Sequence, residues 1–249
     1  MAESQTIYGI HAVEALLEKG ADRIINIWLD RERLDSKLTQ IKATIERLGF
    51  RYESVDKKTL EKLAAGGNHQ GVLIAAKLPQ ERTEEALKKA VKYRQCDAFY
   101  LVLDQVTDPH NLGACMRTAL AAGVQGVIVP KDNSCRINAT VCKVASGAAE
   151  VLPVYRVTNL SRTLKWLKEE GVWLSGAAGE AEQDIFNAEL TGSVAIVMGA
   201  EGKGLRQLTQ QQCDQLIKIP MSTAVESLNV SVATGIILYE VVRQNRQTS

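Results

Sequence analysis

Apolar residues in the first 77 positions recur at helical spacing in some segments and at strand spacing in others. Apolar positions three or four apart predict a helix over Ile7–Lys19, which Gly20 ends, and another over Lys37–Leu48, which Gly49 ends. The remaining elements expected here are strands over 24–29, 50–55 and 71–76 and a short helix over 57–65. These elements predict a small α/β unit of about the minimum size that folds alone.

The segment 78–95 has a different composition. It opens at Pro79 and continues as ERTEEALKKAVKYRQ, which is rich in charge and poor in large apolar residues. This composition favours a linker that contains an exposed helix. We therefore expect one domain over 1–77, a linker over 78–95 and a second domain over 96–249.

From Cys96 onward, short apolar runs alternate with helical patterns. The predicted strands lie over 99–106, 126–129, 151–155, 172–175, 194–198 and 216–219. Their almost uninterrupted apolar character is typical of a parallel sheet that is covered on both faces. A long helix rich in Val, Ile and Leu is expected over Val230–Arg243. Periodicity alone therefore predicts a Rossmann-like α/β domain.

Composition, hydropathy, charge and cysteine content exclude several classes of protein. Of the 249 residues, 45% are hydrophobic and 24% charged, which excludes collagen-like, coiled-coil and disordered chains. No apolar run approaches the roughly 20 residues of a membrane helix, and no secretory signal is visible. Thirty basic and 29 acidic residues give a net charge of +1, which does not by itself indicate nucleic-acid binding. Five Cys without a CxxC pair argue against disulfides and structural zinc, and favour a cytoplasmic protein.

The first chemically unusual segment is DQVTDPHNLGACMRTA, over residues 104–119. A strand ends here, Pro109 fixes a turn, and a helix is expected to begin near Asn111, where free N–H groups can hold an anion. Arg117 follows within two helical turns, so it can serve the same site. The segment is equally consistent with Asp108 or Asn111 as a simple helix cap and Arg117 as an exposed helix residue.

The second segment is MGAEGKGL, over 198–205. Three glycines in six residues after a buried strand indicate that the backbone approaches another group closely, although a plain tight turn would have the same composition. The spacing is neither that of a phosphate-binding loop nor that of the dinucleotide fingerprint. Glu201 would repel phosphate, and it suits hydroxyls, an amine or a sulfonium.

The third segment is IPMSTAVESLNVSVA, over 219–233. A strand ends at Pro220, a polar loop follows, and Ser227 or Asn229 can cap the last helix. Each of these two residues taken singly is consistent with a capped core helix. In open α/β sheets, ligands bind where strands end, and all three segments lie at such places.

In this order, the three segments resemble the SpoU (TrmH) family of RNA ribose 2′-O-methyltransferases in the SPOUT superfamily. The matching stretches are DPHNLGACMRTA at 108–119, IVMGAEGKGL at 196–205 and IPMSTAVESLNVSVATGI at 219–236. The stretches YGIHAVEALLE at 8–18 and NHQGVLIAA at 68–76 resemble the small N-terminal RNA-binding domain of many members, which is similar to the ribosomal L30e fold. Within the family, the whole chain is most similar to bacterial enzymes that methylate a guanosine ribose in 23S rRNA.

The resemblance implies a fold that periodicity does not reveal: a mostly parallel sheet with a deep trefoil knot, although knots are nearly absent from proteins. It also implies a pocket for S-adenosylmethionine built from the knot loops. The cofactor-binding residues carried over are Met198, Gly199, Ile219, Met221 and Leu228. Lys203 and Glu226 are carried over as candidates for substrate tuning.

The implied reaction is methyl transfer to a ribose 2′-hydroxyl without a metal. Arg117 occupies the position of the family's catalytic arginine, and it either deprotonates the hydroxyl with help from a phosphate or stabilises the forming alkoxide. The supporting catalytic residues are Asn111, Glu201, Ser227 and Asn229. The implied partners are 23S rRNA and a second copy of the chain, paired through the knotted domain.

Three other functions remain to be separated from this one. A non-catalytic RNA-binding or ribosome-assembly protein could keep the same scaffold, although the intact Arg117, Glu201 and Asn229 argue against it. A nucleotide-dependent Rossmann enzyme would need the GxGxxG that is missing here. A tRNA ribose methyltransferase would use the same chemistry on a different RNA.

Overall fold

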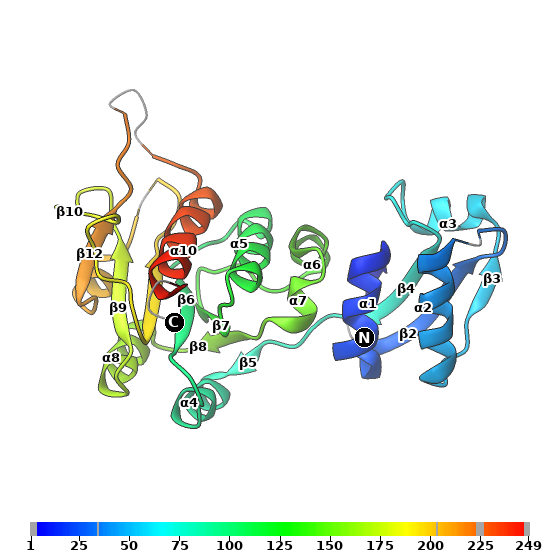
Figure 1. Ribbon diagram of the computed structural model, residues 1–249, viewed down its shortest axis with the longest axis horizontal. Coiled ribbons are helices and arrows are strands. Elements are labelled where there is room, and N and C mark those ends of the chain that lie inside the picture. The colour runs from blue at the N-terminus through cyan, green and yellow to red at the C-terminus, as the bar shows by residue number, and fades with distance from the viewer. Residues whose placement is uncertain (1–3, 34, 203, 223–226, 247–249) are drawn as a thin grey trace. The chain divides into compact units, whose positions relative to one another are not determined.

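The computed structural model describes residues 4–33, 35–202, 204–222 and 227–246 (Figure 1). Lys203 and Glu226, the two substrate-tuning candidates, lie outside these ranges. The chain forms two compact units, one of Met1–Gln80 with Ile137–Val151 and the other of Glu81–Arg136 with Leu152–Ser249. The boundaries expected at residues 77 and 96 stay a prediction, because compactness does not show which part folds alone.

The first unit is built on a four-stranded sheet with the order β1-β4-β2-β3. Its strands are β1 (Ser4–Tyr8), β2 (Ile24–Asp30), β3 (Glu53–Val55) and β4 (Val72–Lys77). β4 is antiparallel to both β1 and β2, whereas β2 and β3 are parallel. The unit also contains α1 (Ile10–Lys19), a 3-10 turn (Ala21–Arg23), α2 (Ser36–Arg47), α3 (Lys57–Leu63), α6 (Ala139–Ala145) and α7 (Ala148–Val151).

The helix expected from Ile7 begins three residues later. Ile7 and Tyr8 belong to β1, and Gly9 turns the chain with a φ of 86°, a backbone conformation that favours glycine. The free N–H of Ile10 donates to Gln70 Oε1 at 2.9 Å. The two N-terminal stretches of the resemblance therefore meet in space, because one supplies the helix start and the other supplies its cap.

The second unit is built on an eight-stranded sheet with the order β10-β12-β9-β11-β6-β7-β8-β5, in which every recorded pair is parallel. Its strands are β5 (Arg82–Thr83), β6 (Phe99–Leu103), β7 (Gly126–Pro130), β8 (Val154–Val157), β9 (Trp173–Ala177), β10 (Gln183–Asp184), β11 (Val194–Met198) and β12 (Gln215–Lys218). The predicted α/β class with a mostly parallel sheet is confirmed, and the knot stays a prediction.

The second unit also contains five helices within the described residues (Figure 1). They are α4 (Glu84–Lys92), α5 (Pro109–Ala121), α8 (Leu160–Glu169), α9 (Gln207–Gln210) and α10 (Val230–Arg246). The expectation of an exposed helix in the charged segment was wrong. Leu87 and Val91 of α4, four residues apart, are fully buried in the core of this unit, so the charges cover only the outer face of the helix.

Candidate functional site

The carboxyl ends of the neighbouring strands β6, β11, β9 and β12 bring the three unusual segments to one edge of the sheet. The segment after β6 leads into α5, the segment after β11 is the glycine loop, and the segment after β12 leads into α10. Parallel strands place all their carboxyl ends on the same side, which is why segments far apart in sequence converge here.

Asn111 joins the three segments. Its Nδ2 donates to Glu201 Oε2 at 3.1 Å, and its Oδ1 accepts from Asn229 Nδ2 at 2.9 Å. Asn111 is only 9% exposed, so this amide is held rigidly between its two partners. Asn229 in turn accepts from both the N–H and the hydroxyl of Ser231, which fixes it at the start of α10. The helix cap is Asp108, which accepts from the N–H groups of His110 and Asn111.

The glycine loop after β11 closes on itself. Ala200 and Gly204 exchange two backbone hydrogen bonds of 3.1 and 2.9 Å. A Cβ on Gly199 would lie 2.1 Å from the carbonyl carbon of Gly204, so no side chain fits at 199. The close approach inferred from the glycines is therefore between two parts of the loop itself.

A buried carboxylate holds the far end of this loop. Asp104 follows β6, and its side chain is fully buried. Its Oδ2 accepts from Thr209 Oγ1 at 2.7 Å and from Arg206 Nε at 3.1 Å, while Oδ1 lies 2.7 Å from Arg206 Nη2 as an ion pair. The backbone N–H of Asp104 also donates to Met198 O at 2.7 Å. Asp104 thereby ties β6, β11 and the chain after the glycine loop together.

A cavity of about 300 Å³ lies between the loops. All five residues expected to bind the cofactor line it, and so do Glu201 and Ser227. The lining also includes Ala177–Glu180, Ile217, Lys218, Val230, Ala233 and Ile237. A second cavity, of about 480 Å³, meets the first at Ala200, Glu201 and Val230.

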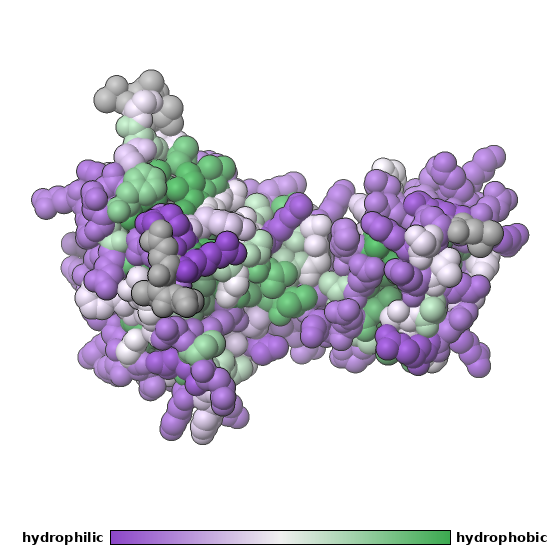
Figure 2. Space-filling model, in the orientation of Figure 1, coloured by the Kyte–Doolittle hydropathy of each residue, from purple (hydrophilic) through white to green (hydrophobic). Residues whose placement is uncertain are grey.

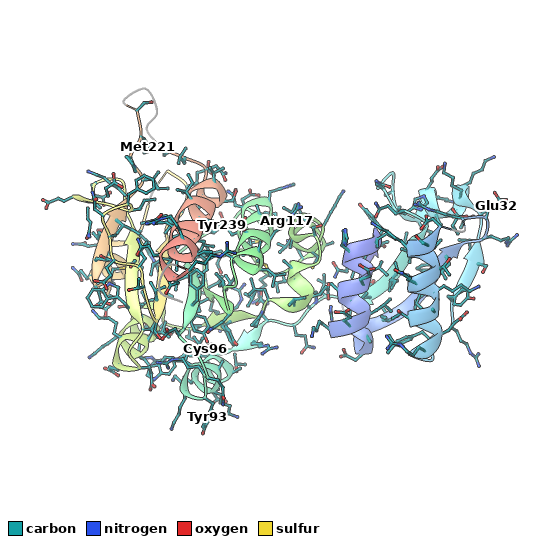
Figure 3. All side chains as sticks on the ribbon, in the orientation of Figure 1. Glu32, Tyr93, Cys96, Arg117, Met221 and Tyr239 are labelled. Carbon is teal, nitrogen blue, oxygen red and sulfur yellow. The ribbon has the colours of Figure 1, made fainter. Side chains whose placement is uncertain are left out.

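Among the predicted catalytic residues, Asn111 lines only the second cavity and Asn229 lines neither, but the two are hydrogen-bonded to each other beside Glu201. Arg117 makes no such contact with the described residues. It is exposed on α5 (Figure 3), where it lines neither of these two cavities and has no hydrogen-bond or ion-pair partner among the described residues. It was expected to face the pocket because it follows Asn111 by less than two turns. The helix instead points Asn111 inward and Arg117 to solvent.

Sequence reasoning missed the segment Ala177–Glu180. It begins at the last residue of β9 and continues into the loop after that strand, and its small residues and single carboxylate carry the same signal as the glycine loop. Among the described residues there is no group of three or more His, Cys, Asp or Glu side chains suited to a metal ion. No helix in the described ranges is long and apolar enough to cross a membrane.

Comparison with protein families identifies the scaffold. Residues 98–239 match the SpoU rRNA Methylase family, which is more than half of the chain. The chain belongs to this family. Residues 6–82 match a second model, RNA 2′-O ribose methyltransferase substrate binding.

Relatives match along nearly the whole chain. The 23S rRNA (guanosine-2′-O-)-methyltransferase RlmB of Vibrio vulnificus is 52% identical over 241 residues, covering 97% of each chain. The protein of the same name from Shewanella oneidensis is 50% identical over 246 residues, covering 99% of this chain and all of its own.

Solved structures share the fold of both units. A crystal structure of an RNA 2′-O ribose methyltransferase has a TM-score of 0.78 and 29% identity, covering 97% of this chain and 88% of that one. The SpoU methyltransferase AviRb from Streptomyces viridochromogenes, in complex with AdoMet, has a TM-score of 0.75 and 23% identity, covering 97% and 90%. The second likeness concerns the fold alone.

Proposed function

We infer that this protein transfers a methyl group from S-adenosylmethionine to the ribose 2′-hydroxyl of a guanosine in 23S rRNA. The observation that carries this inference is the meeting of the three family motifs beside two adjoining cavities, through the hydrogen bonds of Asn111 to Glu201 and Asn229. The relatives that are about half identical along the whole chain support guanosine and 23S rRNA as the target. Because this substrate belongs to the bacterial ribosome, the proposed location is the cytoplasm.

The first cavity fits the cofactor by its chemistry. Apolar Ile217, Ile219 and Leu228 suit a flat adenine, and the carboxylates of Glu180 and Glu201 suit a positively charged sulfonium and amine. Among the described residues that line it, Lys218 is the one basic side chain beside these two carboxylates. When bound there, S-adenosylmethionine supplies an electrophilic methyl group.

The polar residues beside this cavity orient the acceptor. Asn111 is locked by Glu201 and Asn229, so Glu201, which lines both cavities, is held in a fixed position with its Oε1 unused by the described residues, and Ser227 lines the first cavity. We assign these side chains to hydrogen bonds with the acceptor ribose. Holding the hydroxyl in line with the methyl group supplies much of the rate acceleration, because the reacting atoms then meet without a further entropy loss.

Arg117 requires a second copy of the chain in this proposal. It is exposed and unpartnered among the described residues, and it lines neither of the two cavities described above. We assign it to the site of a partner copy, where its guanidinium stabilises negative charge on the reacting oxygen and an adjacent phosphate. Arginine stays protonated, which favours charge stabilisation over proton removal.

The surface of α10 supports such pairing. Val232, Ile236 and Tyr239 lie on one helical face and are 52%, 36% and 51% exposed. Figure 2 shows hydrophobic surface over this helix. α10 packs on α5, because Thr234 accepts a hydrogen bond from Cys115, so the apolar face and Arg117 belong to adjacent helices. A shared apolar face of this kind suits a two-fold interface.

The function is tested by incubating total RNA from cells that lack the protein with tritiated S-adenosylmethionine and separating rRNA from tRNA. We expect label in 23S rRNA, at a single guanosine 2′-oxygen. Label confined to tRNA would replace the proposed substrate. Cofactor binding without label in any RNA would favour a non-catalytic RNA-binding protein.

The cross-subunit role is tested by mixing two inactive variants, Arg117→Ala and Glu201→Ala, after mild dissociation. Each mixed dimer would then contain one site with both intact residues. Random pairing restores about one quarter of wild-type activity if Arg117 acts across the interface. No recovery would be expected if both residues act within one chain, because each mixed dimer would keep only damaged sites.

A further inference from the structure

The second cavity adjoins the one that we assign to the cofactor. It is lined by the segment Gln105–Asp108 together with Asn111, Asn133, Ala200, Glu201 and Val230. Its volume of about 480 Å³ lies within the range of cavities that hold a small molecule. It shares Ala200, Glu201 and Val230 with the first cavity, so whatever it holds lies directly beside the bound cofactor.

We propose that this cavity takes the base of the methylated guanosine, and that Gln105, Asp108 and Asn133 read its Watson–Crick edge. The proposal rests on the function inferred above, because it assigns the base of the same acceptor nucleotide. An unpaired RNA base is recognised by hydrogen bonds to this edge once it is out of the helical stack.

The chemistry of the lining favours a base over a phosphate. The polar side chains among the described residues that line the cavity carry carboxylates, amides and a hydroxyl, the other lining residues are Val or Ala, and none is Lys or Arg. Guanine presents two adjacent donors, N1–H and N2–H, beside the acceptor O6. A carboxylate accepts from the donors, and an amide donates to O6. Uracil places an acceptor where guanine has N2–H, so a carboxylate there repels it.

Asp108 keeps acceptor capacity for a base although it caps α5. Its Oδ1 accepts from His110 N and its Oδ2 from Asn111 N, both at 3.2 Å. A carboxylate has about four lone-pair positions, so each oxygen retains one for a further donor. The side chain is exposed to the cavity, which leaves these positions accessible.

Gln105 and Asn133 both stand in the left-handed backbone region, with φ of 63° and 55°. Asparagine tolerates this region, but glutamine adopts it rarely, and glycine would be the unstrained choice at 105. A side chain retained at a strained position points to a use for that side chain. Both residues line the same cavity, from two different loops.

The two loops are fixed to each other and to the sheet. Cys135 N donates to Val106 O at 2.9 Å, which joins the loop of Asn133 to the loop of Gln105. Arg156 on β8 donates to Pro130 O, Cys135 O and Ser134 Oγ at 2.7–2.8 Å. The two loops that carry Gln105 and Asn133 are therefore held in place before RNA binds.

The test uses a 23S rRNA fragment that contains the guanosine methylated by the wild-type protein, located by mapping 2′-O-methylation. The fragment is prepared with guanosine or inosine at that position, since inosine lacks only the N2 amine. Asp108→Asn keeps a helix-capping oxygen but replaces one acceptor by a donor. We expect the preference for guanosine over inosine in kcat/KM to fall roughly five- to one-hundred-fold in this variant, the range for one well-made base contact.

Two further variants complete the design. Gln105→Gly and Asn133→Gly remove the amides and suit the left-handed backbone, and we expect them to lower discrimination against adenosine at the same position. Asp132→Asn is the matched control, because it removes a charge from the same loop without lining the cavity, and its discrimination should equal that of the wild type.

The outcomes separate this proposal from the function on which it rests. If the wild-type protein methylates no guanosine in 23S rRNA, the proposed function fails first. If it does, but the three variants discriminate within twofold of the wild type, the base lies elsewhere. For a variant that no longer turns over, equilibrium RNA binding decides. A selective loss for the guanosine fragment supports the proposal, and an equal loss for both fragments overturns it.

Discussion

Removing the exposed Arg206 should destabilise the protein at least as much as removing its buried partner Asp104. Arg206→Ala leaves a carboxylate that is fully buried, with Thr209 as the remaining side-chain donor. Stranding a buried charge in this way typically costs about 3–5 kcal/mol. In Asp104→Ala the guanidinium is 45% exposed and turns to water, so the main loss is the buried Thr209 hydroxyl and its charge-assisted bond, about 2–4 kcal/mol.

The assay is equilibrium unfolding in urea, followed by far-UV circular dichroism. A loss of about 3 kcal/mol lowers the midpoint by roughly 1–3 M, because typical m-values are about 1–3 kcal/mol per molar urea. The double variant should lose less than the sum of the two single losses, since removing both partners strands no charge. A loss below about 1 kcal/mol in Arg206→Ala would refute this reasoning, because it would mean that water already reaches Asp104.

Three other predictions follow from the same structure. Arg117→Ala should melt near wild type and bind S-adenosylmethionine in calorimetry, yet lose about 100- to 1,000-fold in single-turnover methylation, and a rate within about threefold of wild type would remove it from the chemical step. Gly199→Val should abolish calorimetric cofactor binding, because its Cβ would overlap the Gly204 backbone and open the loop, and unchanged binding would contradict this. Burial raises the pKa of the Cys115 thiol to about 11, so at pH 8 only about 0.1% is thiolate and mass spectrometry should detect iodoacetamide on exposed Cys96 long before Cys115.

The elements with strong periodicity could be predicted from the sequence. The helix expected over Lys37–Leu48 is Ser36–Arg47, and the strand expected over 194–198 has those bounds. β1 was hidden because Ile7 continues the apolar spacing of the following helix, and only the backbone of Gly9 separates the two. In α4, two buried residues among many charges were too weak a signal for a packed helix.

The sequence motifs supplied candidate site residues, but they did not show which of these residues contact one another. The motifs named Asn111, Glu201 and Asn229, yet their mutual hydrogen bonds depend on the order of β6, β11, β9 and β12 in the sheet, which periodicity does not encode. The structural role of Asp104 could not be predicted, because the sequence does not show which groups a carboxylate at the end of a strand will contact. The outward direction of Arg117 depends on which face of α5 packs against α10.

The hydrogen bonds of Asn111 imply that the protein becomes able to bind the cofactor only late in folding. They span 90 residues to Glu201 and 118 residues to Asn229, so closing these loops comes after local helices and hairpins have formed. During refolding, far-UV ellipticity should therefore recover before ligand binding does. Because these hydrogen bonds form only in the completed fold, ligand binding should also make the protein more resistant to proteases. At one hundred times its Kd, a ligand that binds only the completed fold adds about 2.7 kcal/mol, and a cleaving enzyme would find the opened chain about one hundred times less often.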